Sequence, residues 1–168
     1  MMQLSEFNQS QNGEVNELLK HCVHIERWAH ELIQQRPFAS TELLFQTARL
    51  QANTWTWDEI LAALNTHPRI GEKKAQAALS AKEQVFSDRE QAAVTQDLTI
   101  QQALYEGNVA YEQKFGFIFL IKASGLHSQE ILTALHSRLN NDLESEKHIV
   151  HQQLLEIAQL RLTQEIQA

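Results

Sequence analysis

A histidine, a proline and a glycine close together in the chain form the pattern best suited to proton transfer. They belong to the segment His67-Pro68-Arg69-Ile70-Gly71. Pro68 fixes its own φ and disfavours the helical conformation at His67, so the imidazole leaves the preceding helix on a stiff backbone. Gly71 permits a tight turn, and a titratable ring on such a rigid loop suits general acid–base catalysis. A plain helix–helix corner, in which His67 only ends the upstream helix, explains the same residues, and both interpretations stay open here.

An arginine interrupts the apolar face of the expected C-terminal helix. At 100° per residue, one narrow stripe of this helix carries Val150, Leu154 and Ile157. Arg161 falls in the middle of the same stripe. Its guanidinium must reach solvent along its own stem, pair with a carboxylate, or contact an anion or a polar ligand. Reaching solvent is easy near a helix end, whereas the functional alternative is a charged fork that grips a carboxylate or two carbonyl oxygens.

Ser87, Glu90 and Gln91 form a further polar group near the middle of the chain. The spacing Ser87-x-x-Glu90 is a capping-box pattern, and it predicts a helix that begins after Ser87. A helix cap alone explains the pattern. However, a helix N-terminus also presents free amides to an anion, and a Glu and a Gln side by side there are able to bind a urea- or amide-rich ligand through hydrogen bonds.

Two histidine pairs have the spacing of residues on one helix face. His21 lies three residues before His24, and His148 lies three residues before His151. Neither pair has an obvious third ligand and no His-Glu-x-x-His pattern is present, so we predict no metal site. The sequence also has no glycine-rich phosphate loop, no Gly-x-Ser-x-Gly elbow and no Cys/His nucleophile pair. We therefore expect no nucleotide, flavin or pyridoxal cofactor.

The elements that must position these residues are all expected to be helices. Gly (5) and Pro (2) are scarce, and apolar residues recur at helical spacing between cap and stop signals. We predict an all-α, single-domain bundle of about eight helices with a long C-terminal helix. The expected helices cover Val15–Cys22 with a continuation over Ile25–Leu32 after a break, Leu43–Leu50 after a cap at Ser40, the segment after the capping box Thr56-x-x-Glu59, Ala75–Leu79, the segment after Ser87, Leu98–Tyr111, Gln129–Arg138, and the residues from a cap at Asn141 to about Ile166. The apolar run Phe117–Ile121 is either a buried extended segment or the continuation of a helix.

Length and composition indicate one soluble domain over residues 1–168. Of the 168 residues, 43% are hydrophobic, which is enough to bury a core. A net charge of −7 without a basic run argues against nucleic-acid binding. The single cysteine, Cys22, excludes an internal disulfide and a four-cysteine zinc site, and it suits a reducing compartment. Because the sequence shows no membrane-spanning run, no signal-peptide pattern and no peroxisomal tripeptide, we expect a cytoplasmic protein without membrane association.

Several short motifs follow one another in order along the chain. They are Phe7-Asn8, Arg27-Trp28-Ala29, Arg36-Pro37-Phe38, His67-Pro68-Arg69-Ile70-Gly71-Glu72, Ser87-x-x-Glu90-Gln91, Asn108-x-x-Tyr111-x-x-Lys114-Phe115-Gly116-Phe117-x-Phe119 and Arg161-Leu162. Any one of these motifs alone is weak evidence, but the ordered set covers nearly the whole chain. In this order they resemble the 2-oxo-4-hydroxy-4-carboxy-5-ureidoimidazoline (OHCU) decarboxylase family, which carries out the last step from urate to (S)-allantoin.

The resemblance implies an all-α fold, a homodimer, no cofactor, a small ureidoimidazoline substrate, and a functional link to urate oxidase and 5-hydroxyisourate hydrolase. It assigns catalysis to His67 and Glu90. It assigns substrate binding to Pro68, Ser87, Gln91, Phe117, Ile118, Phe119, Leu120, Ile121 and Arg161. Two alternatives stay open: a cofactor-free hydrolase or isomerase of another ureide, and a non-catalytic helical adaptor, which predicts an exposed Arg161.

Overall fold

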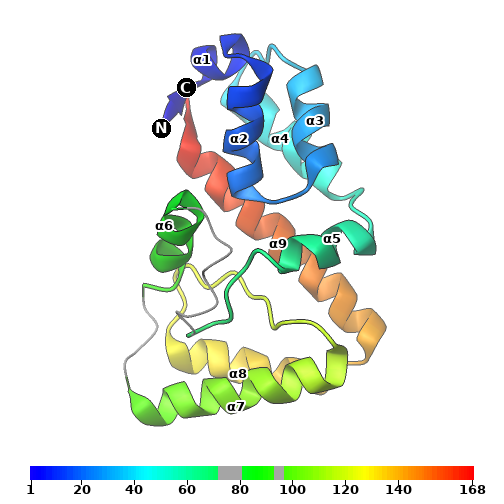
Figure 1. Cartoon of the computed structure of the whole chain (residues 1–168), viewed down its shortest axis with the longest axis vertical. Helices are drawn as coiled ribbons and strands as arrows, with labels where there is room; N and C mark the ends of the chain where they lie inside the picture. The colour runs from blue at the N-terminus through cyan, green and yellow to red at the C-terminus, as the bar shows by residue number, and fades with distance from the viewer. Residues whose placement is uncertain (72–80, 93–96) are drawn as a thin grey trace. The chain divides into compact units, whose positions relative to one another are not determined.

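The computed structural model of the chain describes residues 1–71, 81–92 and 97–168 (Figure 1). Within these ranges the secondary structure is almost entirely helical, which confirms the predicted all-α class and the long C-terminal helix. The described elements are β1 (Met2–Gln3), α1 (Leu4–Gln9), α2 (Asn12–Cys22), α3 (Glu26–Gln34), α4 (Thr41–Ala52), α5 (Trp57–Leu64), α6 (Ala81–Glu90), α7 (Leu98–Phe115), α8 (Ser128–Arg138), α9 (Leu143–Glu165) and β2 (Ile166–Gln167). None of the helices in these ranges is long and apolar enough to cross a membrane.

The chain divides into two compact units. Unit 1 consists of Met1–Ala63 and Leu154–Ala168, and unit 2 consists of Leu64–Gln153. Helix α9 therefore contributes its first part to unit 2 and its second part to unit 1. In unit 1 the short strands β1 and β2 pair in parallel, with Met2 opposite Ile166, so both ends of the chain belong to the same unit.

Helix caps in unit 1 lie where the sequence predicts them. The Ser40 hydroxyl accepts a hydrogen bond at 3.1 Å from the amide three residues on, and it starts α4. Before α5, the Thr56 amide donates to Glu59 Oε1 at 2.9 Å and the Glu59 amide donates to Thr56 Oγ1 at 3.2 Å, which confirms the capping box. Helix α3 packs against both α2 and α4 (Figure 1). The buried Trp28 of α3 also donates its indole N–H to the Ala48 carbonyl at 3.0 Å.

Residues far along the chain hold the C-terminal end of α1. Asn8 exchanges two hydrogen bonds with the backbone of Phe38: Nδ2 donates to the carbonyl at 2.9 Å, and Oδ1 accepts from the amide at 2.8 Å. Arg36 donates from Nη1 to the carbonyls of Phe7 at 2.6 Å and Ser10 at 2.9 Å. Two of the motifs noted in the sequence therefore serve the packing of unit 1.

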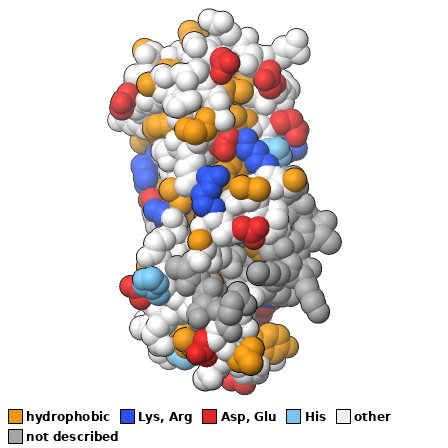
Figure 2. Space-filling view, turned by 90° about the vertical axis from the view of Figure 1, so that its left-hand side faces the viewer, with side chains coloured by type: hydrophobic (Ala, Val, Ile, Leu, Met, Phe, Trp, Pro, Cys, Tyr) orange, Lys and Arg blue, Asp and Glu red, His pale blue; other side chains and the backbone are white. Residues whose placement is uncertain are grey.

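Charged side chains in unit 1 pair across helices. Arg49 of α4 donates to both carboxylate oxygens of Glu156 of α9, at 2.7 and 3.3 Å. Arg27 of α3 donates to both oxygens of Glu59, at 3.2 and 3.0 Å, and this hydrogen bonding lowers the pKa of Glu59. On the face that Figure 2 presents, acidic side chains also lie close to basic ones.

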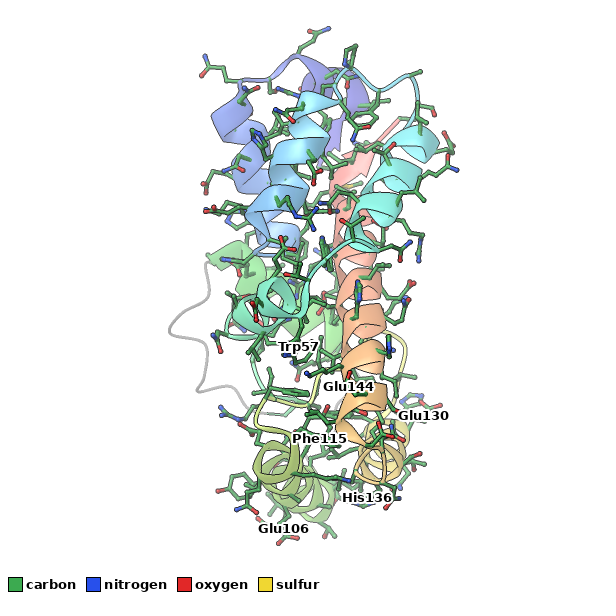
Figure 3. All side chains as sticks on the ribbon, turned by 90° about the vertical axis from the view of Figure 1, so that its right-hand side faces the viewer. Trp57, Glu106, Phe115, Glu130, His136 and Glu144 are labelled. Carbon is green, nitrogen blue, oxygen red and sulfur yellow. The ribbon has the colours of Figure 1, made fainter. Side chains whose placement is uncertain are left out.

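In unit 2, helices α7 and α8 lie side by side (Figures 1 and 3). Asp97 caps α7 by accepting hydrogen bonds from two amides of the first turn, at 2.9 and 3.2 Å. Gly116, with a φ of +82°, ends the helix in the left-handed conformation that glycine favours. Between the ends, Gly107 permits a close approach to α8, because a Cβ atom at this position would lie 2.4 Å from Leu135 Cδ2.

Helix α6 differs from the prediction at its start. It runs from Ala81 to Glu90, so helical residues precede Ser87 and the expected helix start after Ser87 is wrong. A capping box needs a non-helical residue at its first position. Ser87 and Glu90 lie one turn apart at the C-terminal end of the helix instead. The helix expected at Ala75–Leu79 lies outside the described residues.

The start of α9 is shifted by one residue from the prediction. The Asp142 carboxylate, rather than Asn141, accepts a hydrogen bond from the Ser145 amide at 2.7 Å and caps the helix. This hydrogen bond is the main cause of a lowered pKa at Asp142. The Asn141 side chain instead donates to Glu146 Oε2 at 3.0 Å, so it belongs to a buried polar group described below.

Candidate functional site

The loop that carries His67 follows α5 and is held by side chains of α7. The amide of His67 donates to the Leu64 carbonyl at 3.0 Å, and its side chain is half-buried. Arg69 donates from Nε and Nη2 to the two carboxylate oxygens of Glu112, each at 2.8 Å. Asn108 Nδ2 donates to the Ile70 carbonyl at 3.2 Å. The backbone on both sides of the buried Pro68 is therefore fixed, and this fixes the position of the His67 backbone that carries the imidazole.

Gln91 links this loop to the end of α6. Its Oε1 accepts a hydrogen bond from the Gly71 amide at 3.1 Å. Gly71 has a φ of +80°, a conformation that glycine adopts without strain. Ser87 is buried at 3% exposure, and Glu90, the last residue of α6, is half-buried. The hydrogen bond of Gln91, the residue that follows α6, therefore ties the C-terminal end of this helix to the loop of His67.

The run Phe117–Ile121 has no helical structure, which decides between the two alternatives left by the sequence in favour of a buried extended segment. Phe117, Phe119 and Leu120 are buried, and Ile118 and Ile121 are half-buried. Both buried phenylalanines of the segment lie edge-on to Tyr111 of α7, with ring centroids 5.9 and 5.3 Å away. Phe115, at the end of α7 (Figure 3), stacks on Phe117 at 6.0 Å.

Sequence reasoning missed a buried ion pair beside this segment. Arg138, 7% exposed, donates from Nε to Glu146 Oε1 at 2.7 Å, and Glu146 has no exposed surface. The Tyr111 hydroxyl donates to the same oxygen at 2.5 Å. Burial, with this hydrogen bond, raises the pKa of Tyr111. Arg138 lies in the last turn of α8 and Glu146 in the first turn of α9, where such charges are common, so no local sequence pattern points to this buried pair.

Arg161 is buried in the structure. It belongs to unit 1, is 3% exposed, and donates from Nη1 to the Cys22 carbonyl at 3.4 Å. The interpretation in which the guanidinium reaches solvent is therefore wrong, and so is the exposed Arg161 that a helical adaptor predicts. The other residues assigned to the site, His67 to Ile121, belong to unit 2.

A pocket of about 480 Å³ borders the loop of His67 on the side of α7. Ile70 and Gly71 contribute to its lining from the loop, and Tyr105, Asn108 and Glu112 contribute from the helix. The part of its lining that the structure describes contains none of the residues assigned to catalysis or substrate binding. Across residues 1–71, 81–92 and 97–168, no group of three His, Cys, Asp or Glu side chains is arranged to hold a metal ion.

Comparison with known proteins decides the family. Residues 8–163 match the sequence profile of the OHCU decarboxylases. The chain belongs to the OHCU decarboxylase family. Its fold is also similar to that of a solved OHCU decarboxylase, whose crystal structure was determined in the presence of (S)-allantoin. The TM-score is 0.72 at 29% sequence identity, and the match covers 92% of this chain and 97% of the other.

Two curated relatives of this OHCU decarboxylase family member differ in length. The uric acid degradation bifunctional protein TTL of Arabidopsis thaliana is 32% identical over 145 residues, which is 85% of this chain and 44% of the relative. The 2-oxo-4-hydroxy-4-carboxy-5-ureidoimidazoline decarboxylase of Haloferax volcanii is 25% identical over 129 residues, which is 77% of this chain and 74% of the relative. The chain therefore spans less than half of the bifunctional relative.

Proposed function

We propose that this chain is a cofactor-independent carboxy-lyase that converts OHCU to (S)-allantoin and CO₂. The family match over residues 8–163 carries the proposal, because it includes every residue assigned to the site. The Haloferax volcanii relative bears the name of this activity. Burial of Arg161 adds support, since it contradicts the alternative in which the chain is a non-catalytic adaptor.

The substrate itself supplies the electron acceptor for decarboxylation. The bond between the carboxylate and its ring carbon breaks, CO₂ leaves, and the electron pair moves into the adjacent C=N unit of the ring. The enol-like species must then gain a proton on one face only, because the product has a single (S) centre. The protein therefore needs a positioned proton donor and a site that holds the ring in one orientation.

The residues of unit 2 fit these two tasks. His67 moves the proton, and Glu90 orients the imidazole or the substrate and tunes its basicity. Because Gln91 Oε1 is bonded to the Gly71 amide, we assign the Nε2 donor of Gln91 to a carbonyl of the ureido group or the ring. The hydroxyl of Ser87 bonds a further polar group of the ligand.

The remaining assigned residues act on charge and on water. Arg161 holds a carbonyl or carboxylate oxygen of the substrate through its planar fork. In this assignment, Pro68 and the apolar residues of the segment 117–121 line the site and exclude water, and the segment also offers backbone groups to the substrate. A dry environment favours loss of a charged carboxylate and protects the enol-like species from hydrolysis.

The proposal is tested by making the unstable substrate in place from urate with urate oxidase and 5-hydroxyisourate hydrolase. Circular dichroism then follows the formation of (S)-allantoin against the slow racemic background. We expect this chain to hasten the reaction and to give the (S) product. Racemic product at the background rate would refute the decarboxylase proposal, and further conversion of (S)-allantoin would indicate a hydrolase or isomerase of another ureide instead.

Replacement of His67 tests the assignment of the proton-transfer group. We expect His67→Gln to lower the rate by about 10²- to 10⁴-fold, the usual contribution of a general acid or base. The matched control is His136→Gln, because His136 is an exposed histidine of α8 outside the assigned site (Figure 3). Turnover of His67→Gln at the level of His136→Gln would contradict the assignment.

The proposal also covers the domain organisation, the oligomeric state and the compartment of the enzyme. We assign the activity to residues 1–168 acting as one domain, because the family match spans residues of both units. The resemblance supports a homodimer in the cytoplasm, linked functionally to urate oxidase and 5-hydroxyisourate hydrolase. Sedimentation equilibrium tests the dimer, and a molar mass near the 19.3 kDa of one chain would contradict it.

A further inference from the structure

We propose that Arg138 is a positioning residue, which fixes the backbone of the Phe117–Ile121 segment where this segment meets the ligand. The inference rests on the proposed function, in which the segment lines the substrate site. It concerns a residue outside the motifs that indicate the family. Its basis is a set of contacts within unit 2, between the end of α8, the start of α9 and the segment itself.

Arg138 holds the segment through both its backbone and a side chain. Nη1 of Arg138 donates to the Leu120 carbonyl at 2.6 Å, a short hydrogen bond from a charged donor. The guanidinium carbon also lies 4.5 Å from the centre of the Phe119 ring, a distance typical of cation–π contacts. Two consecutive residues of the segment are thus tied to one rigid plane, which restricts both the peptide orientation and the aromatic ring.

The guanidinium is itself held by buried groups. Nε donates to Glu146 Oε1 at 2.7 Å, and Nη2 lies 2.5 Å from the same oxygen. Glu146 accepts further hydrogen bonds from the Tyr111 hydroxyl and from Asn141 Nδ2. Because the carboxylate is fully buried and bonded from three sides, Arg138 cannot shift without breaking charge-assisted hydrogen bonds in a medium of low dielectric.

The segment has a second anchor on its C-terminal side. The amide of Lys122 donates to Gln153 Oε1 at 2.8 Å. With Leu120 held by Arg138 and Lys122 held by Gln153, the backbone of Ile121 between them has little freedom. The geometry thus presets the backbone groups that the segment offers to a ligand, which lowers the loss of conformational entropy on binding.

Arginine is needed for this role rather than any cation. The contacts use Nε, Nη1 and the face of the guanidinium at the same time, whereas the ammonium of lysine is one point charge. Arg138→Lys keeps a positive charge beside Glu146 and should therefore fold. It cannot hold Glu146 and the Leu120 carbonyl with the original geometry.

The test combines hydrogen exchange with kinetics in the full-length chain. We expect Arg138→Lys to raise amide exchange in the segment 117–122 and to lower kcat/KM by about 10- to 100-fold, mainly through kcat, because misplacement affects the oriented transition state most. Tyr111→Phe removes one donor to Glu146 and keeps the ring, so it should change both quantities in the same direction but less. Arg49→Lys is the control, since Arg49 makes a bidentate pair with Glu156 in unit 1.

Each outcome bears on the proposal. Exchange in the segment at the wild-type level would overturn it, as would raised exchange with an unchanged kcat/KM. An equal rise in exchange throughout α7 and α8 would also overturn it, because Arg138 would then only stabilise the fold. If Arg138→Lys does not fold, Tyr111→Phe decides by the same criteria. If the wild-type chain does not hasten (S)-allantoin formation, the proposed function fails, but the exchange measurement still tests whether Arg138 positions the segment.

Discussion

Because Gly107 lies close to Leu135, we predict that Gly107→Ala destabilises the fold when Leu135 is present and stabilises it when Leu135 is replaced by alanine. Gly107→Ala removes the high backbone entropy of glycine, which favours the helix by about 0.5–1 kcal/mol. The new Cβ would lie 2.4 Å from Leu135 Cδ2 and 3.1 Å from Cγ, whereas carbon atoms prefer about 3.5–4.0 Å. Because Leu135 is fully buried, we expect an overpacking penalty of about 1–3 kcal/mol. The net effect is a destabilisation of about 0–2.5 kcal/mol.

Removing the leucine should reverse that effect. Leu135→Ala alone costs about 2–5 kcal/mol, because it leaves a cavity. Leu135→Ala removes the three atoms nearest to the new Cβ, so in this background Gly107→Ala should stabilise by about 0.5–1 kcal/mol. The free energies of unfolding come from urea titrations of the four proteins of the cycle.

Gly13→Ala is the matched control. Gly13 lies in α2, and a Cβ there meets nothing within 4 Å. It should stabilise by up to about 1 kcal/mol whether or not Leu135 is present. The reasoning is refuted if Gly107→Ala changes the free energy of unfolding equally in both backgrounds, within about 0.5 kcal/mol.

Two further predictions concern helix starts in unit 1. Ser40→Ala should destabilise by about 0.5–2 kcal/mol, because the α4 cap is lost, and Ser40→Asp should restore most of it; equal unfolding free energies for the two variants would argue against a capping role. Hydrogen bonding from Arg27 holds the pKa of Glu59 below its ordinary value of 4.5. The ionised Glu59 side chain therefore stabilises the fold above pH 4.5, and this stabilisation is lost as the pH falls through the lowered pKa. We therefore expect the melting temperature of wild type to exceed that of Glu59→Gln near pH 6 and the difference to shrink as the pH falls below 4.5. A difference that stays constant with pH would contradict this.

Local signals in the sequence predict the helices well where they are unambiguous. Ser40 and the Thr56-x-x-Glu59 box mark real helix starts, because a non-helical turn precedes each of them. The same pattern at Ser87 gives a wrong start, since the Ser-x-x-Glu spacing also occurs inside a helix and the sequence alone does not show what precedes it. At Asn141, two neighbouring residues both suit a cap, and the choice of Asp142 depends on the tertiary use of the Asn141 side chain.

Local sequence patterns predict less about the candidate site than about the helices. Arg161 is found from the sequence because it breaks an apolar stripe, but its burial and its hydrogen bond to the Cys22 carbonyl depend on residues far away in the chain. Arg138 and Glu146 each look like ordinary charges at helix ends. Their burial follows only from the packing of α7 against α8, from the hydrogen bond of Tyr111 to Glu146 and from the packing of the aromatic segment against Tyr111, which no short-range pattern encodes.

The hydrogen bonds around α1 also determine the order in which unit 1 can assemble. A helix of six residues is too short to persist alone in water. Its carbonyl groups and Asn8 find their partners in Arg36 and Phe38, which lie 26 to 30 residues later. During synthesis, the first helix therefore has to wait until the chain has passed α3, and the N-terminal residues are left open to proteases until then.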